Sequence, residues 1–179
     1  VPNSEEAQWA AYQMADTIFR GGRHQEAASL YGTIVERYPK SPNLSLAYLR
    51  LAQAAYQLKD AEKALNQVQQ LLSTFPKAPE TADAFELAEA VFDVDPGQDF
   101  QEFFKTVIQG DPSSLVAGEA QFRLARRLYE NKNYKASGQE FQRFSVSYTN
   151  HASLPKAQLL LGESYFNLGQ FIEAIPAYE

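Results

Sequence analysis

One short pattern returns five times along the chain at nearly constant spacing. In each case Leu or Met precedes a small residue in similar surroundings, and the small residues are Ala15, Ala52, Ala88, Ala125 and Gly162. The steps between them are 36 or 37 residues. A period of this length is typical of repeat proteins, in which each unit buries its apolar face only by stacking on its neighbours.

Two further markers keep the same period. Twelve residues after each first marker stand Ala27, Ala64, Phe100, Ser137 and Ala174, and four residues later stand Tyr31, Val68, Phe104, Phe141 and Tyr178. The first of these positions is small in every unit but the third, and the second is always bulky. Two antiparallel helices approach to about 8–10 Å only where the side chains at their crossing are short. We therefore predict a crossing at pairs such as Ala52 and Ala64.

Each unit is predicted to contain two helices. In the second unit, apolar residues recur at spacings of three and four over residues 46–58 and again over residues 61–74, which indicates amphipathic helices. Gly21-Gly22, Lys59-Asp60 and Asn131-Lys132-Asn133 are predicted to form turns between paired helices.

Prolines separate the units. Pro39, Pro76 and Pro112 each follow a predicted helix, and proline ends helices because it lacks an N–H and restricts the preceding residue. N-caps of the helices that follow the unit boundaries are predicted at Ser45, Thr81, Ser114 and Ser153.

Composition excludes several classes of function. The net charge of −6 argues against a nucleic acid or an anionic membrane surface as the main partner. No stretch reaches the roughly 18 consecutive apolar residues of a membrane helix. With no cysteine and only His24 and His151, both expected at the surface, a thiolate site, a metal centre or a catalytic triad is not expected.

Other sites of chemistry are not predicted either. Asp93, Asp95 and Asp99 faintly resemble a calcium loop, but Gly97 stands one position early and Phe104 replaces the closing glutamate. A solvated acidic turn is the preferred interpretation. No nucleophile elbow and no phosphate-binding glycine loop occurs, so we expect no catalytic residue, no cofactor and no enzyme activity.

The fifth unit carries a family resemblance. Residues 158–178 contain Leu161-Gly162, Tyr165, Gly169 with Phe171 two residues later, Glu173-Ala174-Ile175 and Tyr178, and this series resembles a tetratricopeptide repeat. The resemblance extends over residues 1–179 as one array, with units near 5–40, 43–77, 80–112, 115–150 and 153–179. It implies an all-α fold, a right-handed superhelical solenoid of nine or ten helices in antiparallel pairs.

A narrower resemblance follows from unit length. Units of 36–37 residues with a Tyr-Pro-Lys-Ser-Pro ending at residues 38–42 are similar to bacterial cell-envelope repeat proteins, such as the outer-membrane assembly lipoprotein and the periplasmic coordinator of the Tol system. This similarity implies a periplasmic or envelope location, with a cytoplasmic one as the alternative.

The resemblance also implies a function. First helices in this family line a concave groove that holds another protein or a peptide segment, and the positions carried over are Trp9, Tyr12, Asp16, Phe19, Arg20, Leu49, Gln53, Tyr56, Phe85, Glu89, Phe92, Phe122, Arg126, Tyr129, Glu163 and Phe166, with Leu159 continuing one row. Arg50 and Arg123 stand at the edges of the second and fourth units. Partly exposed aromatic residues with interleaved charge suit helix-in-groove recognition, but these aromatics could instead pack against neighbouring units.

Alternatives remain open. The array could be an architectural spacer, a self-association module or a regulatory domain of a larger protein. The chain stops at Glu179 inside the last predicted helix, so we expect a piece of a longer protein, with possible self-association through that helix.

Phe100 and Asp95-Pro96-Gly97 interrupt the third unit, where we expect a splayed helix pair or a shifted second helix.

Overall fold

The computed structural model describes residues 4–178, and these residues form ten helices and no strand. The chain divides into two compact units, residues 1–99 and 100–179; Glu179, where the sequence suggested an interrupted helix, lies outside the described residues. The predicted all-α repeat fold is confirmed, and its division into two units falls inside the third sequence repeat.

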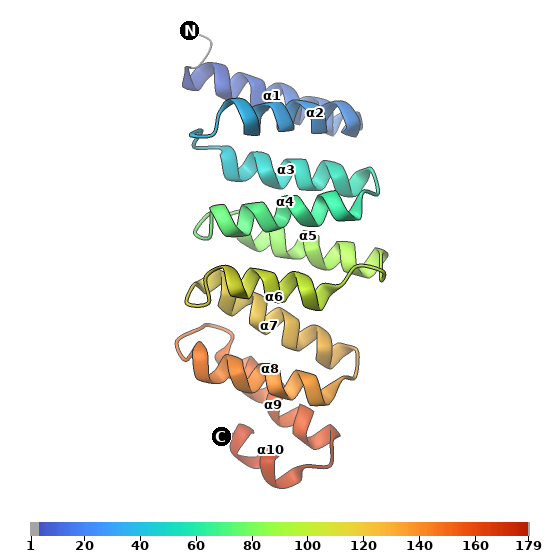
Figure 1. Ribbon diagram of the computed structural model, residues 1–179, viewed down its shortest axis with the longest axis vertical. Helices are drawn as coiled ribbons and strands as arrows, with labels where there is room; N and C mark the ends of the chain where they lie inside the picture. The colour runs from blue at the N-terminus through green and yellow to red at the C-terminus, as the bar shows by residue number, and fades with distance from the viewer. Residues whose placement is uncertain (1–3, 179) are drawn as a thin grey trace. The chain divides into compact units, whose positions relative to one another are not determined.

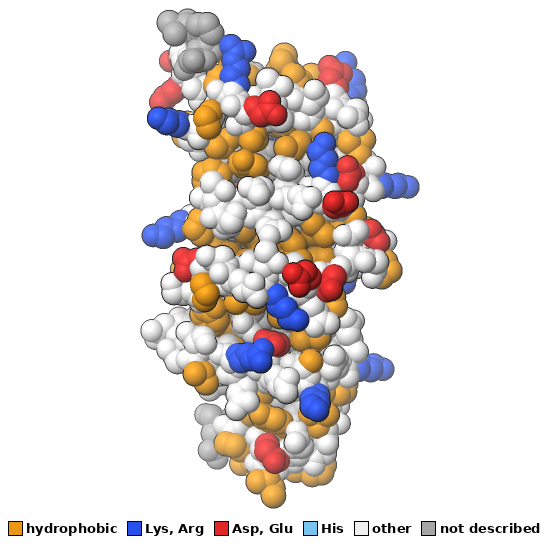
Figure 2. Space-filling model, in the orientation of Figure 1, with side chains coloured by type: hydrophobic (Ala, Val, Ile, Leu, Met, Phe, Trp, Pro, Cys, Tyr) orange, Lys and Arg blue, Asp and Glu red, His pale blue; other side chains and the backbone are white. Residues whose placement is uncertain are grey.

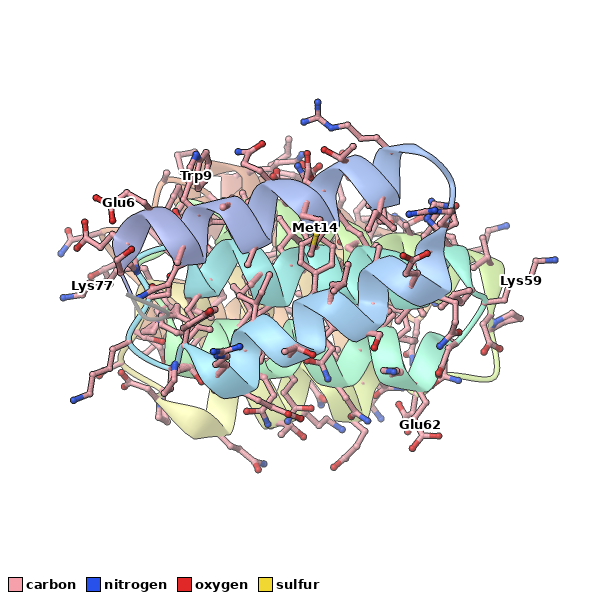
Figure 3. All side chains as sticks on the ribbon, turned by 90° about the horizontal axis from the view of Figure 1, so that it is seen from above. Glu6, Trp9, Met14, Lys59, Glu62 and Lys77 are labelled. Carbon is pink, nitrogen blue, oxygen red and sulfur yellow. The ribbon has the colours of Figure 1, made fainter. Side chains whose placement is uncertain are left out.

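Unit 1 contains five helices, of which the first four form two antiparallel pairs (Figure 1). They are α1 (Glu5–Arg20), α2 (His24–Arg37), α3 (Leu44–Gln57), α4 (Ala61–Thr74) and α5 (Thr81–Val94). Each helix packs on the next, and α3 also contacts both α1 and α5. The first helices of successive pairs therefore form one layer, while α2 and α4 lie on the other side (Figure 3).

Unit 2 repeats this arrangement with α6 (Phe100–Gly110), α7 (Leu115–Glu130), α8 (Tyr134–Ser147), α9 (Leu154–Asn167) and α10 (Phe171–Tyr178). Consecutive helices are packed together, and α7 also contacts α9.

The periodic small residues are buried, and in the fourth repeat the two markers touch, because the Ser137 hydroxyl donates to the Ala125 carbonyl at 2.9 Å. Ala15, Ala52, Ala88 and Ala125 are fully buried, as are Ala27, Ala64 and Ser137 at the second marker. Bulky partners fill the space beside them, and Tyr31, Val68, Phe104 and Phe141 are also fully buried. Tyr178 is the exception, with 48% of its surface exposed. The marker residues of the sequence repeat therefore belong to the core, as expected if short side chains allow close helix crossings.

Four of the turns between paired helices contain a residue with a positive φ at the same position. Gly22, Lys59, Lys132 and Gly169 have φ of 77°, 61°, 59° and 74°, and each lies seven residues after the first marker. The equivalent residue in the third repeat is Asp95, whose φ is −129°. Pro96 follows it, and a residue before proline is held near extended backbone.

The following helix begins late in that repeat. The other second helices start nine residues after the first marker, whereas α6 starts at Phe100, twelve residues after Ala88. The predicted shift of this helix is confirmed in its starting residue, and the predicted splaying stays a prediction.

The N-cap predictions hold only in part. Ser114 caps α7, and its hydroxyl accepts from the Ala117 N–H at 3.0 Å. Ser153 precedes α9 but makes no such bond. Ser45 and Thr81 are wrong as caps because α3 begins two residues earlier than expected, after Asn43, and α5 begins one residue earlier, after Glu80. The hydroxyl of Thr81 instead donates to the Ala78 carbonyl.

Candidate functional site

The layer formed by α1, α3 and α5 in unit 1 places the predicted partner-binding residues in two environments. Five of them are buried, with at most 5% of their surface exposed: Tyr12, Asp16, Leu49, Phe85 and Phe92. The expectation that these positions are partly exposed is wrong, because neighbouring helices cover them. Their own part in partner binding stays a prediction, and in this structure their side chains lie in the interior of the unit.

The other predicted residues of unit 1 retain accessible surface. Trp9 and Arg20 are exposed, and the half-buried members are Phe19, Gln53, Tyr56 and Glu89. These side chains belong to α1, α3 and α5, the three helices that form the layer. A partner approaching this layer would therefore meet aromatic, amide and charged groups together.

A buried carboxylate joins α1 to α3. Asp16 accepts from the guanidinium of Arg50 at 3.1 Å and from that of Arg20 at 2.8 Å, while the Tyr31 hydroxyl lies 3.4 Å from the same carboxylate. The Asp16 side chain is only 8% exposed. A buried charge needs such partners, since an unpaired one is strongly destabilising.

Arg50 is the centre of this network. Its Nε also donates to the Tyr12 hydroxyl at 3.3 Å, and one Nη donates to the Gln53 side-chain oxygen at 2.8 Å. The Arg50 side chain keeps 27% of its surface exposed. The guanidinium is therefore fixed in one orientation and still reaches solvent.

The tyrosines of this cluster have perturbed acidities. Burial raises the pKa of Tyr12 despite the opposing hydrogen bond from Arg50, and the Asp16 charge adds to the increase. Burial likewise raises the pKa of Tyr31, with further contributions from Tyr12 and Asp16. Both phenols therefore remain protonated donors well above neutral pH.

An aromatic stack covers the outer end of the network. The Trp9 and Tyr12 rings are parallel within 10°, with centroids 5.6 Å apart, and Tyr12 contacts Tyr31 at 5.8 Å. Trp9 itself is 47% exposed. One face of the indole is thus held by the protein, and the ring still presents surface to a partner.

Unit 2 has a smaller polar cluster on its own first helices. Phe122 is buried, so its predicted exposure is wrong, whereas Arg126, Tyr129 and Glu163 are half-buried and Phe166 is 58% exposed. The Tyr129 hydroxyl donates to the Glu163 carboxylate at 2.8 Å, a bond that joins α7 to α9. This hydrogen bond, more than burial, raises the pKa of Tyr129.

Two members of the unit 1 network were not among the predicted site residues. Sequence analysis places Arg50 at the edge of its repeat and Tyr31 in the core, but the structure joins both to Asp16. The sequence offers one weak indication of a role for Arg50, which is that Arg50 and Arg123 occupy the same position in the second and fourth repeats. Arg123 forms an ion pair with Glu119 of its own helix at 2.5 Å, so the shared sequence position does not by itself identify the partners of either arginine.

Metal chemistry finds no support in the described residues. Across residues 4–178, no group of three or more His, Asp or Glu side chains is arranged to hold a metal ion. The carboxylate of Asp95 instead accepts from the Gly97 N–H at 3.2 Å and from the Gln98 amide at 3.0 Å.

Among residues 4–178, none of the ten helices is long and apolar enough to cross a membrane.

The histidines differ from the expected surface residues. His24 is half-buried and meets the edge of Phe19, with ring centroids 5.0 Å apart. His151 has a side chain only 11% exposed and packs against Phe144 at 5.2 Å. Its Nδ1 accepts from the Ser153 N–H at 3.1 Å. The surface expectation is therefore wrong for His151, which helps to fold the turn before α9.

A concentration of exposed apolar side chains lies on the last two helices of unit 2 (Figure 2). Its members are between 42% and 83% exposed and comprise Leu159, Phe166, Leu168, Phe171, Ile172, Ile175 and Tyr178. We call this set the α9–α10 apolar surface. Contiguous apolar surface on a soluble protein commonly marks an interaction site.

Known families and structures were compared with the chain. Two models described as tetratricopeptide repeat match residues 6–77 and 155–179, together more than half of the sequence. No protein with a curated description matches it.

Solved structures share the fold at low sequence identity. A crystal structure of the MamA protein is 12% identical with a TM-score of 0.54, covering 98% of this chain and 90% of that one. BtubC (BKLC) from P. vanneervenii is 15% identical with a TM-score of 0.54, covering 97% of this chain and 77% of that one. The apo form of RapI is 12% identical with a TM-score of 0.58, covering 97% and 52%.

Proposed function

The chain belongs to the tetratricopeptide-repeat family, and on that premise we propose that it is a non-catalytic adaptor that holds a segment of another protein. Proteins with this fold generally act as scaffolds for protein–protein interaction. The proposed binding surface is the layer of first helices in unit 1, which we call the inner face: the accessible side chains of α1, α3 and α5 around Arg50.

The fixed guanidinium of Arg50 is the observation that carries this proposal. Asp16, Tyr12 and Gln53 already hold it in place, and 27% of its side chain remains exposed. A partner that hydrogen-bonds to Arg50 therefore does not have to order a long side chain, an ordering that costs about 0.5–1.5 kcal/mol for a rotamer-rich residue. Preorganised polar groups of this kind favour binding and fix the orientation of a partner.

Trp9 supplies the apolar part of the same surface. Tryptophan, tyrosine and arginine dominate the binding energy of protein interfaces because they combine large area with polar reach. Here the Trp9 ring is already stacked on Tyr12 and still 47% exposed. An apolar side chain of the partner would bury the free indole surface, while Arg50 and Gln53 would hydrogen-bond to its backbone or polar groups.

The experiment uses Trp9 both as a variant site and as a reporter. It is the only tryptophan in the chain, so its emission reports occupation of the inner face directly. A displayed library of random 15-residue peptides is selected against the full chain. Individual dye-labelled peptides are then titrated by fluorescence anisotropy with each protein, and the Trp9 emission is followed in the wild-type chain. We expect selected peptides to shift that emission and to lose at least about tenfold in affinity for the Trp9→Ala variant, as hot-spot residues do.

Met14 offers a matched control on the same helix. It is 52% exposed and projects from a different side of α1 (Figure 3). Met14→Ala removes a similar apolar area and should leave peptide affinity unchanged. Selected peptides that bind the Trp9→Ala and wild-type proteins equally, without changing the emission of Trp9, contradict the inner face as the binding surface.

We propose a bacterial envelope assembly as the setting of this adaptor. The support is the similarity of the 36–37-residue units and the Tyr38–Pro42 ending to envelope repeat proteins. Fractionation of cells that express the native gene, with periplasmic and cytoplasmic marker proteins as references, tests it. Recovery in the periplasmic or envelope fraction supports the proposal, and recovery in the cytoplasm favours the alternative location.

An architectural role is the second candidate, because the α9–α10 apolar surface could join two copies of the chain. Ile172 and Ile175 are 83% and 61% exposed. Sedimentation of the wild-type chain over a range of concentrations, beside an Ile172→Ser, Ile175→Ser variant, tests this role. Concentration-dependent association that the double substitution abolishes supports self-association; a wild-type monomer at all concentrations rejects it.

A further inference from the structure

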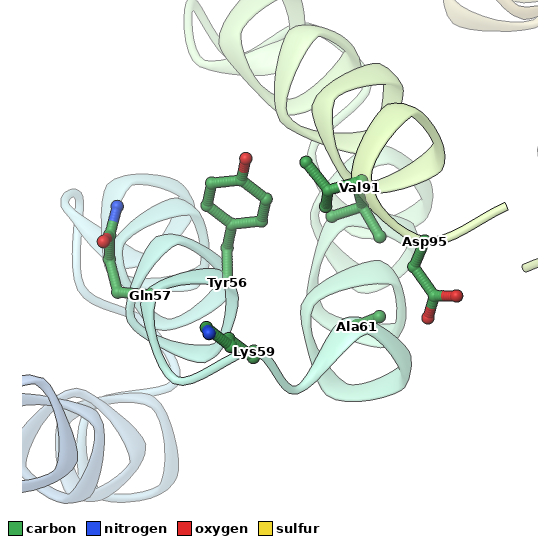
Figure 4. Close-up of a pocket in the computed structure, with 7 residues that line it drawn as sticks. Tyr56, Gln57, Lys59, Ala61, Val91 and Asp95 are labelled. Carbon is green, nitrogen blue, oxygen red and sulfur yellow. The ribbon is translucent and has the colours of Figure 1, made fainter.

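A cavity of about 540 Å³ opens in unit 1 near the ends of α3 and α5. Seven residues line it: Tyr56, Gln57, Lys59, Ala61, Val91, Val94 and Asp95. Figure 4 shows the Tyr56 ring and the Val91 side chain projecting toward each other from α3 and α5, with Ala61 on the first turn of α4. We call this space the α3–α5 cavity.

The inner wall of the cavity is apolar. Val91 is fully buried, Ala61 is half-buried, and Val94 stands at the rim with 66% of its surface exposed. The half-buried Tyr56 side chain makes no hydrogen bond to any residue between 4 and 178. A branched aliphatic side chain inserted here would contact Val91 and the Tyr56 ring, and burying it would be favourable at about 25 cal/mol per Å² of apolar area.

The charge of unit 1 as a whole is strongly one-sided. Residues 1–99 contain 14 Asp and Glu against 8 Lys and Arg, a net charge of −6, whereas residues 100–179 contain 8 of each. The whole net charge of the protein therefore belongs to the unit that holds the cavity. No Lys or Arg occurs between Lys77 and Lys105, a stretch that includes all of α5.

Acidic side chains on α5 are available at the surface. Asp83 and Glu86 are exposed and form no ion pair within the described part of the chain. Lys59 is the only cation lining the cavity, and it stands on the turn between α3 and α4. Because the unit as a whole is strongly acidic, its field attracts cationic partners and repels anionic ones.

We propose that the α3–α5 cavity receives an aliphatic side chain from a basic peptide segment, whose Lys or Arg residues lie along the acidic surface of α5. The cavity provides the apolar contact, and Asp83 and Glu86 provide the preference for positive charge. This inference rests on the proposed adaptor function and names the chemistry of the partner. A purely apolar segment would lack the electrostatic attraction, and a purely basic one would leave the cavity empty.

Three capped hexapeptides test this inference on the full chain. One alternates Lys and Leu, the second alternates Lys and Ser, and the third alternates Glu and Leu. Dissociation constants come from fluorescence anisotropy of dye-labelled peptides at about 0.1 M salt, where charges within roughly 10 Å still interact. We expect the Lys-Leu peptide to bind at least about tenfold more tightly than either of the others, and its affinity to fall as salt rises.

Matched pairs of variants locate the binding. Asp83→Lys with Glu86→Lys should weaken the Lys-Leu peptide about fivefold or more, whereas Glu26→Lys with Glu36→Lys, an equal change of charge at exposed positions of α2, should have a much smaller effect. Val94→Ser should weaken it about threefold or more by removing apolar contact. Val146→Ser is its control, because Val146 is 76% exposed and belongs to unit 2.

Each outcome bears on one of the two proposals. Equal binding of the Lys-Leu and Glu-Leu peptides overturns the charge preference, and equal binding of the Lys-Leu and Lys-Ser peptides overturns the cavity. An unchanged dissociation constant in the Asp83→Lys, Glu86→Lys variant or in Val94→Ser overturns the inference as well. Failure of the adaptor proposal is seen separately, as library-selected peptides that ignore Trp9→Ala, since Trp9 does not line the cavity.

Discussion

Replacing Asp16 with Asn should weaken unit 1 at the contact between its first two helix pairs. The substitution keeps the size of the side chain, but it removes the negative charge and turns one acceptor into a donor. That donor faces the guanidinium groups of Arg50 and Arg20, 3.1 Å and 2.8 Å from the carboxylate oxygens. Arg50 would remain on α3 without its buried counter-charge.

The magnitude follows from the exposure of each partner. The Arg20 side chain is 75% exposed, so its pair with Asp16 contributes at most about 0.5 kcal/mol. Arg50 is only 27% exposed, and a charge-assisted hydrogen bond in such a setting contributes about 1.5 kcal/mol after allowance for its remaining contact with water. The expected loss in the free energy of unfolding is therefore about 2 kcal/mol.

Urea unfolding followed by Trp9 emission measures this loss where it occurs. Trp9 stacks on Tyr12, which accepts from Arg50, so the fluorophore adjoins the affected network. Far-UV circular dichroism of the same samples reports the whole chain. Glu26→Gln is the control, because the Glu26–Arg23 pair is exposed on both sides and should change stability by less than about 0.5 kcal/mol.

A double-mutant cycle with Arg50→Met separates the pair from its surroundings. If the carboxylate and guanidinium stabilise each other, the double variant is less destabilised than the two single losses predict, with a coupling of about 1 kcal/mol or more. An Asp16→Asn variant that loses no more than Glu26→Gln, or a cycle without coupling, would refute the network as a link between α1 and α3.

Three further predictions concern the core, the acidity of the cluster and the turns. Ala52→Leu should lower the free energy of unfolding by about 1–3 kcal/mol in urea titrations, because Ala52 is fully buried and predicted to lie at a helix crossing; a loss of a few tenths would place Ala52 away from a crossing. Burial raises the pKa of Tyr31 above its usual 10, so its deprotonation favours the unfolded chain and stability should fall as pH rises above 10. Stability measured from pH 8 to 11.5 should decline less in Tyr31→Phe, and an identical decline would contradict this assignment. Lys132→Gly should raise the unfolding temperature by up to about 3 °C, since Lys132 has φ of 59° and glycine adopts that backbone without strain. Lys105→Gly within α6 should instead lower it.

The sequence predicted the local architecture well because that architecture repeats. Ala52 and Ala64, the pair predicted to lie where α3 and α4 cross, are both fully buried, and the predicted second helix over residues 61–74 agrees with α4. Pro96 predicted the late start of α6, because a proline restricts the backbone of the residue before it, here Asp95. These features depend on neighbouring residues, and helical periodicity and proline geometry are local properties.

The tertiary structure alone decided which side chains face solvent. Both Trp9 and Phe85 occupy predicted groove positions, yet Trp9 is 47% exposed and Phe85 is 1% exposed. A period of 3.6 residues defines the faces of a helix, but it does not say how completely other hairpins cover each face. The bond between Arg50 and Tyr12 spans 38 residues, so it depends on how whole hairpins pack and not on any pattern within one of them.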